Sequence, residues 1–210
     1  MLPATKMEEK SNPSEILGIL KKNNYRLVAI DGVDGSGKSS LSKKLSEELG
    51  YRHINLDDYL EKNRGNFVKY IKYQVLENEI QSTKKPIIIE GVCVLAVLKN
   101  LGLRPDYLIY IKRMSEFEFW KDEHLCDVEV DIDAFIENEN LELQKFSEVV
   151  SDIEGEEFNP ENSKIPKLRE EIIRYHYEFK PHRDANLVYK KLTANKQLQG
   201  TSRGCAPSGP

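Results

Sequence analysis

Short apolar stretches alternate along the chain with longer segments in which apolar residues recur every three or four positions. The short stretches are rich in Ile, Val, Leu and Tyr, which is typical of buried strands, and the longer segments have the period of amphipathic helices. Strands are predicted at residues 25–31, 52–56, 86–90, 106–111 and 186–189, and helices at 38–49, 66–82, 92–101 and 167–177. Since strands that alternate with helices form crossover units, the pattern predicts an α/β fold with a parallel five-stranded sheet covered by helices on both faces.

Both ends of the chain are polar and lack this periodicity. Residues 1–13 are expected to be flexible and residues 193–210 to form a disordered tail, which leaves residues 14–192 as one folded domain. No apolar run approaches the roughly 20 residues of a membrane helix, and the first residues lack the apolar core of a secretory signal. The three cysteines are widely spaced and form no CxxC pair, so a cytoplasmic protein without a disulfide framework is expected.

Charge is distributed unevenly. Residues 122–161 contain fifteen acidic residues and one base, Lys145, so this segment carries −14 while the rest of the chain carries +10. A basic body suits anionic ligands such as phosphates, and no basic run with interleaved aromatic residues indicates nucleic acid. Apolar residues within the acidic segment follow helical spacing, which predicts one or two amphipathic helices. Without an EF-hand pattern, a solvated acidic face is favoured over a metal site.

The segment from Gly32 to Ser39, GVDGSGKS, fits the pattern G-x-x-x-x-G-K-[ST] at every position. It follows an apolar strand and opens an amphipathic helix, which is the context of a phosphate-binding loop. Its glycines let backbone N–H groups turn towards an anion, and the helix N-terminus adds positive partial charge. Lys38 would supply a cation to the phosphates and Ser39 a hydroxyl to Mg²⁺. The candidate ATP-binding residues are Gly32, Asp34, Gly35, Ser36, Gly37, Lys38, Ser39 and Ser40.

The sequence lacks the second motif that would mark two other nucleotide-binding classes, the GTPases and the protein kinases. The Asn-Lys pair at Asn195 has no aspartate two residues after the lysine, so it is not the base-reading motif of a GTPase. His-Arg-Asp at residues 182–184 is followed by neither D-F-G nor A-P-E, so a protein kinase is not indicated either.

Acidic residues follow two of the predicted strands. Asp57 and Asp58 come after the second strand, and Glu90 ends the third. Because the carboxyl ends of parallel strands line the ligand crevice, these acids are expected at the same edge as the phosphate loop. One of them could orient an acceptor hydroxyl as a base and the other could hold the metal ion or its water. Capping of a following helix is the alternative, about as strong as function for Asp58 and weaker for Asp57.

The strand–loop–helix unit, LDDYL at residues 56–60 and IIIEG at residues 87–91 together resemble the uridine kinase and nicotinamide riboside kinase family of small-molecule kinases. The resemblance implies a P-loop NTPase fold, ATP and Mg²⁺ as cofactors, and transfer of the γ-phosphoryl group to a hydroxyl of a nucleoside or similar molecule. It also implies catalytic roles for Lys38, Asp57 and Arg113. Asp57 would take the acceptor proton, Arg113 would clamp phosphates, and Ser39 and Glu90 would lie at the metal.

The acidic segment departs from the family, whose lid is short and rich in arginine. We expect residues 122–161 to form a mobile lid or a partner-facing insert outside the sheet core. Bases would then reach the site from its flanks, and Arg113, Arg169 and Arg174 are the candidates. Tyr59 could stack on a flat base or lie in the core.

Two other functions remain open. A nucleoside-monophosphate kinase is one, because Val33-Asp34-Gly35 resembles the loop of thymidylate kinases, although no Asp-Arg-Tyr-like motif follows the third strand. A non-catalytic nucleotide-binding regulator is the other, and the presence of Lys38, Asp57 and Glu90 argues against it. The sequence specifies neither the acceptor nor the oligomeric state.

Overall fold

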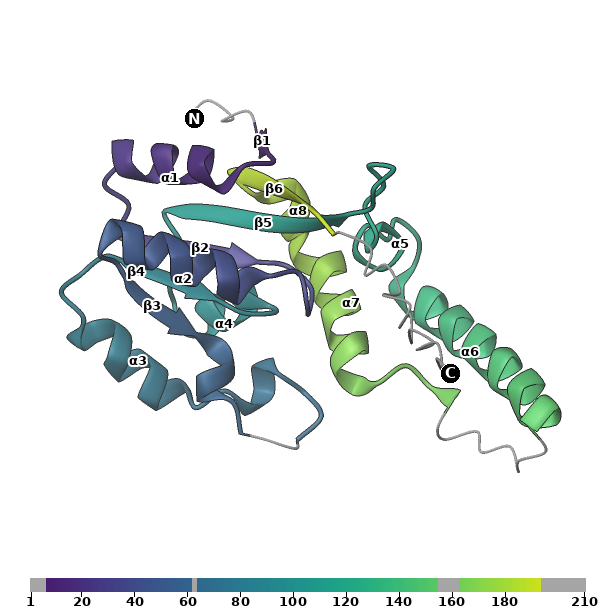
Figure 1. Cartoon of the computed structure of the whole chain (residues 1–210). Coiled ribbons are helices and arrows are strands. Elements are labelled where there is room, and N and C mark those ends of the chain that lie inside the picture. Colours follow the sequence, from purple (N-terminus) through teal and green to yellow (C-terminus); the bar gives the residue numbers. More distant parts are fainter. Residues whose placement is uncertain (1–6, 62–63, 155–162, 194–210) are drawn as a thin grey trace, which may run out of the picture.

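Six parallel strands form the central sheet of the computed structural model, which describes residues 7–61, 64–154 and 163–193 (Figure 1). Their spatial order is β1-β6-β5-β2-β4-β3. The strands are β1 (Glu8–Lys10), β2 (Leu27–Asp31), β3 (Arg52–Asn55), β4 (Ile87–Glu90), β5 (Tyr107–Met114) and β6 (Leu187–Leu192). Every residue of β2 and β4 is buried, as expected of central strands covered on both faces.

Helices cover both faces of this sheet, as the sequence predicted. The α-helices of the described residues are α1 (Pro13–Lys22), α2 (Lys38–Leu49), α3 (Tyr73–Ser82), α4 (Val94–Asn100), α5 (Glu123–Cys126), α6 (Ile132–Glu154), α7 (Lys167–Phe179) and α8 (Pro181–Asp184). Two apolar clusters pack against the sheet. Helices α1 and α2 contribute to one, together with Val28 and Ile30, while α3, α4 and α7 contribute to the other, together with Ala29 and Ile89.

The prediction of five strands is wrong by one, because β1 pairs in parallel with β6 at the sheet edge. Its residues Glu8, Glu9 and Lys10 are polar, and an edge strand exposed to solvent needs no apolar alternation. Helix α1 then begins at Pro13, where the Asn12 side chain accepts a hydrogen bond from the Ser14 N–H at 2.9 Å. The expectation of flexibility is therefore wrong for residues 8–13, and residues 1–6 lie outside the described part of the chain.

The helix predicted at residues 66–82 is divided. A short 3₁₀ turn, η2 (Val68–Tyr70), is separated from α3 by Ile71, which is extended and forms an antiparallel bridge with Leu60. The N–H groups of Phe67 and Val68 donate to the Glu171 carboxylate on α7, at 2.5 and 3.1 Å. Tertiary contacts thus override the helical periodicity here, and they fix the loop that follows β3.

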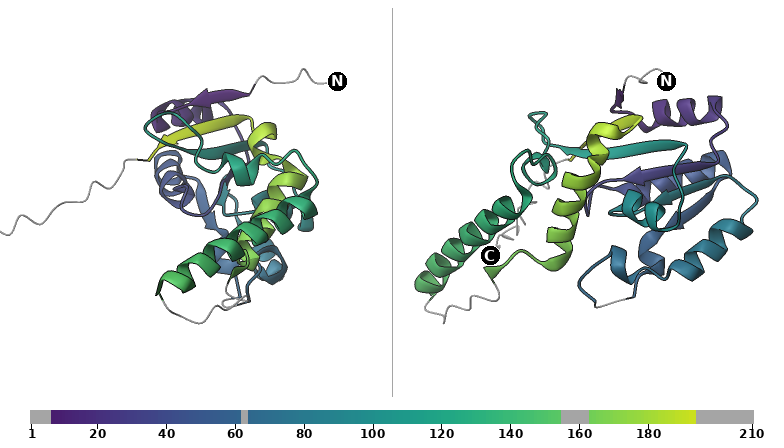
Figure 2. Two further views of the ribbon diagram at one scale, coloured as in Figure 1. Left: turned by 90° about the vertical axis from the view of Figure 1, so that its right-hand side faces the viewer. Right: turned by 180° about the vertical axis from the view of Figure 1, so that it is seen from behind.

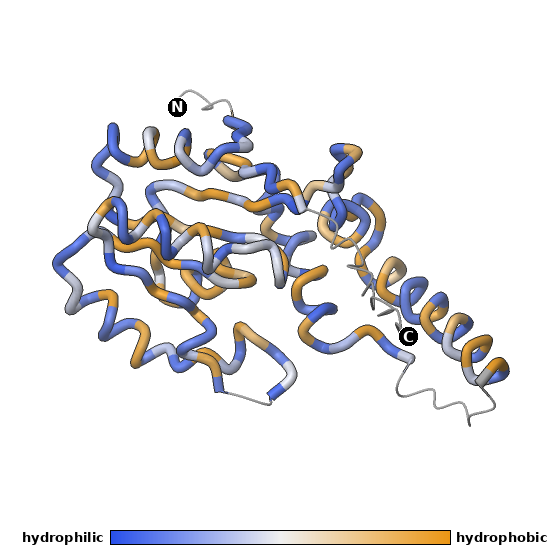
Figure 3. The backbone as a smooth tube through the Cα atoms, viewed as in Figure 1, coloured by the Kyte–Doolittle hydropathy of each residue, from blue (hydrophilic) through white to orange (hydrophobic). Residues whose placement is uncertain are grey.

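The acidic segment is not uniform. Cys126 of α5 belongs to the apolar cluster formed with α3, α4 and α7, which we call the main apolar cluster. The beginning of the acidic segment therefore lies in the core, and not outside it as expected. Ile136, near the start of α6, packs against Val128 and Ile173. Farther along, α6 extends away from the sheet (Figure 2), and its hydrophobic and hydrophilic residues are interspersed (Figure 3). The expected insert ends at residue 161, and residues 155–162 lie outside the described part.

None of the helices among the described residues is both long and apolar enough to cross a membrane. The predicted disordered tail falls almost wholly on residues 194–210, which lie outside the described part. Thr193, which precedes them, donates its N–H to the Met114 carbonyl at 3.0 Å and so continues the pairing of β6 with β5.

Candidate active site

The phosphate-binding motif forms the turn from β2 into α2. Gly35 and Gly37 adopt positive φ angles of 68° and 92°, in the left-handed region that a side chain would strain. Gly37 is the N-cap of α2, and no side chain caps that end, so the first N–H groups of the helix remain available to a ligand. The sequence predicted this geometry directly, because the motif is contiguous.

Lys38, the first residue of α2, folds back across the loop. Its Nζ donates to the Val33 carbonyl at 2.8 Å, and only 7% of the residue is exposed. Burial lowers the pKa of Lys38, while the carboxylates of Asp31 and Glu90 oppose that shift. A lysine held in this way is a cation with little water around it, which strengthens its attraction for a phosphate oxygen.

A cleft of about 630 Å³ opens over the loop. It brings together most of the predicted site residues, namely Asp34, Gly35, Gly37, Lys38, Ser39, Ser40, Asp57 and Glu90. Gly32 and Ser36 also belong to the loop, but they are buried and do not line the cleft. The remaining wall is apolar apart from Lys191, and consists of Leu60, Phe67, Val92 and Leu168.

Asp57 and Asp58 occupy different environments, although they are adjacent in the short helix η1 (Leu56–Tyr59). The cap of η1 is Asn55, whose side chain accepts from the Asp57 N–H at 2.9 Å, so neither acid is needed as the cap. Asp57 lines the cleft, where desolvation and then the charge of Glu90 raise the pKa of its carboxyl group. Both side chains are exposed, but Asp58 does not line the cleft, which favours Asp57 as the functional acid.

Glu90 ends β4 and is 1% exposed. Its Oε1 has no hydrogen-bond partner among the described residues, and His53 Nε2, at 3.6 Å, is too far to provide one. A buried carboxylate oxygen without a partner is costly unless a cation or water completes its shell. Glu90, Asp57 and Ser39 offer the hard oxygen ligands that Mg²⁺ prefers, so the residues fit this ion.

The protein alone does not supply a complete metal cage. In the described part of the chain, no group of three or more His, Cys, Asp or Glu side chains could hold a metal ion. Mg²⁺ in phosphoryl-transfer sites commonly takes one or two carboxylates and completes its shell with substrate phosphates and water. The site therefore suits an ion that arrives with a nucleotide.

Arg113 lies in a neighbouring cavity of about 470 Å³, which shares Asp34 and Leu168 with the cleft. Its Nε donates to the buried Asp122 carboxylate at 2.9 Å, and its Nη2 donates to the other oxygen of the same carboxylate. These hydrogen bonds raise the pKa of Arg113. Its remaining nitrogen, Nη1, lies 3.6 Å from the position that a Cβ on Gly35 would take, so Arg113 faces the phosphate loop.

The other two candidate arginines, Arg169 and Arg174, lie in different places. Arg169 lines the same cavity as Arg113, together with Lys121. Arg174 lines neither space and instead donates to Asp133 of α6 at 2.7 Å and to Glu170 at 2.8 Å. The expectation that Arg174 would reach the site is therefore wrong. Tyr59 is half-buried and packs against the main apolar cluster.

Sequence reasoning missed a buried polar pair directly behind the loop. Asp31, the last residue of β2, is fully buried and accepts from the Tyr175 hydroxyl and from the Gly32 N–H, the latter at 2.7 Å. Burial raises the pKa of Asp31 to about 7. The acid at the end of an apolar strand was a visible signal, whereas its partner on α7 is 144 residues away.

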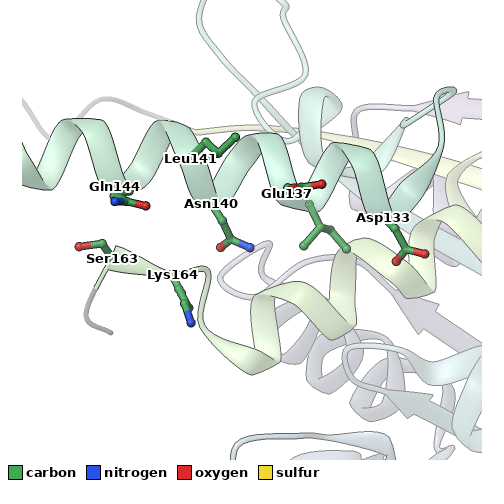
Figure 4. Close-up of a pocket in the computed structure, with 8 residues that line it drawn as sticks. Asp133, Glu137, Asn140, Leu141, Gln144, Ser163 and Lys164 are labelled. Carbon is green, nitrogen blue, oxygen red and sulfur yellow. The ribbon is translucent and has the colours of Figure 1, made fainter. Parts of the chain in front are cut away.

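A further hollow lies along α6, remote in sequence from the loop and lined by none of the predicted site residues (Figure 4). It has a volume of about 300 Å³, and Asn140 and Gln144 of α6 face Ser163 and Lys164 across it, with Asp133 and Glu137 farther along the same helix. Asn140 accepts from the Ile165 N–H at 2.8 Å. This hydrogen bond ties α6 to the segment that enters α7.

Comparisons with known proteins agree on the class. The family model for shikimate kinase matches residues 34–86. The cytidylate kinase of Aster yellows witches'-broom phytoplasma is 43% identical over 25% of this chain and 20% of its own length. That of Mycoplasmopsis synoviae is 29% identical over 70% of this chain and 49% of its own length. A Pyrococcus furiosus protein named "Putative adenylate kinase" is 28% identical over 71% of this chain and 96% of its own length.

The resemblance to P-loop small-molecule kinases is thereby confirmed, and the fold is a P-loop kinase fold. The chain spans only 20 to 49% of the length of the first two relatives. Among solved structures, one described as "Structure of a Possible Uridine Kinase from Bacillus stearothermophilus" aligns with a TM-score of 0.42 and 14% identity, over 85% of this chain and 97% of that one. The relatives differ in acceptor, so the acceptor has to be argued from the cleft.

Proposed function

We propose that this protein transfers the γ-phosphoryl group of ATP to a hydroxyl group of a nucleoside or a similar small molecule. The observation that carries the proposal is the composition of the cleft. Its phosphate side holds the loop and Lys38, and its other walls hold two carboxylates, Asp57 and Glu90, among apolar side chains. Use of ATP and Mg²⁺ fits this arrangement, and we propose in addition that the enzyme is cytoplasmic.

Each residue would act through its own chemistry. The backbone N–H groups at the start of α2 and the Lys38 ammonium would bind and orient the phosphates. Ser39 and Glu90 would hold Mg²⁺, which when bound neutralises charge on the phosphates. Asp57 would accept a hydrogen bond from the acceptor hydroxyl and take its proton as the new bond forms. Its raised pKa makes the carboxylate a better proton acceptor than an ordinary aspartate.

The charge on the acceptor side favours a neutral acceptor. A monophosphate placed next to Asp57 and Glu90 would be repelled by both carboxylates in a partly desolvated space. A nucleoside or sugar-like molecule carries hydroxyls that can donate to those oxygens, and a flat or apolar part that can rest on Leu60, Phe67 and Val92.

A second candidate function is supported by the neighbouring cavity. Arg113, Lys121 and Arg169 line it, and such a cluster could bind the phosphate of a nucleoside monophosphate. The cytidylate and adenylate kinases among the relatives act on acceptors of that kind by their names. We rank this function second because Asp122 already occupies two donors of Arg113.

A coupled assay of ADP release tests the proposal. The acceptors are uridine, cytidine, adenosine, nicotinamide riboside and shikimate, with CMP, UMP and AMP as phosphate-bearing counterparts. Acceptor-dependent ADP release with at least one hydroxyl acceptor is expected, and release only with monophosphates would instead establish the second function. If no acceptor stimulates release although ATP binds, the enzymatic proposal fails for these acceptor classes.

A further inference from the structure

Lys191, near the end of β6, reaches the phosphate loop. A Cβ built on Gly37 would stand 1.9 Å from its Nζ, 3.1 Å from its Cε and 3.3 Å from its Cδ. The ammonium group therefore lies against the backbone where the loop turns into α2. Lys191 also lines the cleft together with Lys38 and Ser39. No motif pointed to it, because its position depends on the pairing of the last strand.

The sheet register explains how two cations arrive at one loop. Arg113 of β5 and Lys191 of β6 are direct neighbours in the parallel pairing. Arg113 faces Gly35 and Lys191 faces Gly37, so the two adjacent strands deliver one cation to each of these glycines. Lys190, one residue earlier, has its Nζ 2.5 Å from the Glu9 carboxylate. Alternation along the strand thus separates a paired lysine from one directed at the loop.

Lys191 has no hydrogen-bond or ion-pair partner within the described residues. Arg113, by contrast, is held by Asp122, and Lys38 by the Val33 carbonyl. The N-terminus of α2 carries positive partial charge, so an ammonium group beside it is repelled unless an anion lies between them. Its position is therefore favourable only with a negatively charged ligand on the loop.

We propose that Lys191 is a nucleotide ligand, whose ammonium group binds the phosphate chain of ATP or ADP from the β6 side of the loop. This inference rests on the nucleotide binding in the proposed function and adds a residue to it. Arg113 and Lys191 would flank the phosphates, and the acidic segment would not need to supply a base. Lys191 touches the cofactor and not the acceptor, so its removal should weaken nucleotide binding for every acceptor alike.

Nucleotide titration by calorimetry tests this inference without requiring turnover. The proteins are the wild type, Lys191→Ala, Lys191→Arg and the matched control Lys190→Ala, and the ligands are ATP with Mg²⁺, ADP with Mg²⁺ and adenosine. For Lys191→Ala, the affinity for ATP and ADP should fall by about 10-fold or more, as expected for the loss of a charge-assisted hydrogen bond. Lys191→Arg should recover most of that loss, and Lys190→Ala should bind as the wild type does.

Adenosine and salt separate a phosphate contact from a structural role. Adenosine lacks phosphates, so its affinity should not change in Lys191→Ala, and the defect with ATP should shrink at high ionic strength. Equal ATP affinities of Lys191→Ala and the wild type would overturn this inference and leave the proposed function intact. The same loss in Lys190→Ala, or a loss for adenosine, would overturn it too. A wild type that does not bind ATP would overturn both proposals.

Discussion

Charged residues lie both around the phosphate loop and along helix α6, but they differ in burial. Around the loop, Asp31, Lys38 and Glu90 are buried, and burial moves the pKa of Asp31 up and that of Lys38 down. On α6 the charges lie at the surface, as in the exposed pair of Lys145 and Glu142. Exposed pairs of this kind contribute little to stability. Buried charge, and not the number of charges, therefore distinguishes the candidate site from α6.

The apolar residues of the two regions differ in the same way. Those around the loop are buried in the two clusters that pack on the sheet. On the outer part of α6, Phe146, Val149 and Ile153 are 69, 57 and 79% exposed. The amphipathic period of α6 is thus satisfied by burial only over its first half, where Ile136 is buried and Leu143 is partly buried.

The largest expected effect is at Lys38. Lys38→Ala removes the cation that the loop holds over the cleft, and phosphoryl transfer should fall by about 1000-fold, the upper range for loss of a preorganised transition-state donor. Lys44→Ala, an exposed position on the same helix, should retain the wild-type rate. Steady-state ADP release measures both variants, with circular dichroism as the check on folding. Unchanged turnover in Lys38→Ala would contradict the assignment of the loop.

Asp57 gives the next largest effect. Asp57→Asn keeps the shape of the side chain but cannot take a proton, so kcat should fall by about 100-fold while ATP affinity stays close to the wild type. Asp58→Asn is the matched control, because Asp58 is the adjacent acid, is exposed as Asp57 is, and lies outside the cleft. Kinetics with saturating ATP measure the two variants side by side. A severe defect in Asp58→Asn with a mild one in Asp57→Asn would show that the neighbouring acid is the functional one.

Lys38, Asp57 and Glu90 show how much of the candidate site could be predicted from the sequence. Lys38 belongs to a contiguous motif, and Asp57 and Glu90 follow strands, so their shared edge could be predicted from the parallel order. Lys191 and the Tyr175 partner of Asp31 could not, since both reach the loop through tertiary packing across large sequence separations. Strand β1 was missed because an edge strand of three polar residues has no apolar pattern.

A smaller effect separates the two arginines that were candidates together. Arg113→Ala should slow transfer by about 10-fold, because Arg113 faces the loop and Asp122 fixes its orientation. Arg174→Ala should have the wild-type rate, because its exposed ion pairs go to Asp133 of α6 and to Glu170. Single-turnover rates at saturating ATP compare them. A slower Arg174→Ala enzyme would mean that α6 acts on the site after all.

The last effect concerns stability and not activity, and is a pH dependence of the free energy of unfolding at Asp31. Its pKa is raised from 3.8 to about 7 in the folded protein, so between pH 4 and 7 the folded state binds more protons than the unfolded state. Asp31 therefore lowers the free energy of unfolding as pH rises through this range, by about 1.4 kcal/mol per pH unit at most. Urea unfolding from pH 4 to 7 should show a flatter profile for Asp31→Asn. Parallel profiles would contradict a buried, proton-binding Asp31.

The central claim is that the cleft transfers a phosphoryl group to a hydroxyl and not to a phosphate. Phosphorus NMR of two separate reactions with ATP and Mg²⁺, one with nucleosides and one with nucleoside monophosphates, reports the chemical class of the acceptor directly. We predict a new phosphate monoester resonance that appears with ADP, and that is absent with Lys38→Ala and strongly reduced with Asp57→Asn. ADP formation only in the reaction with monophosphates, or a monoester formed from nucleosides equally well by Lys38→Ala, would show that the cleft does not transfer the phosphoryl group to a hydroxyl.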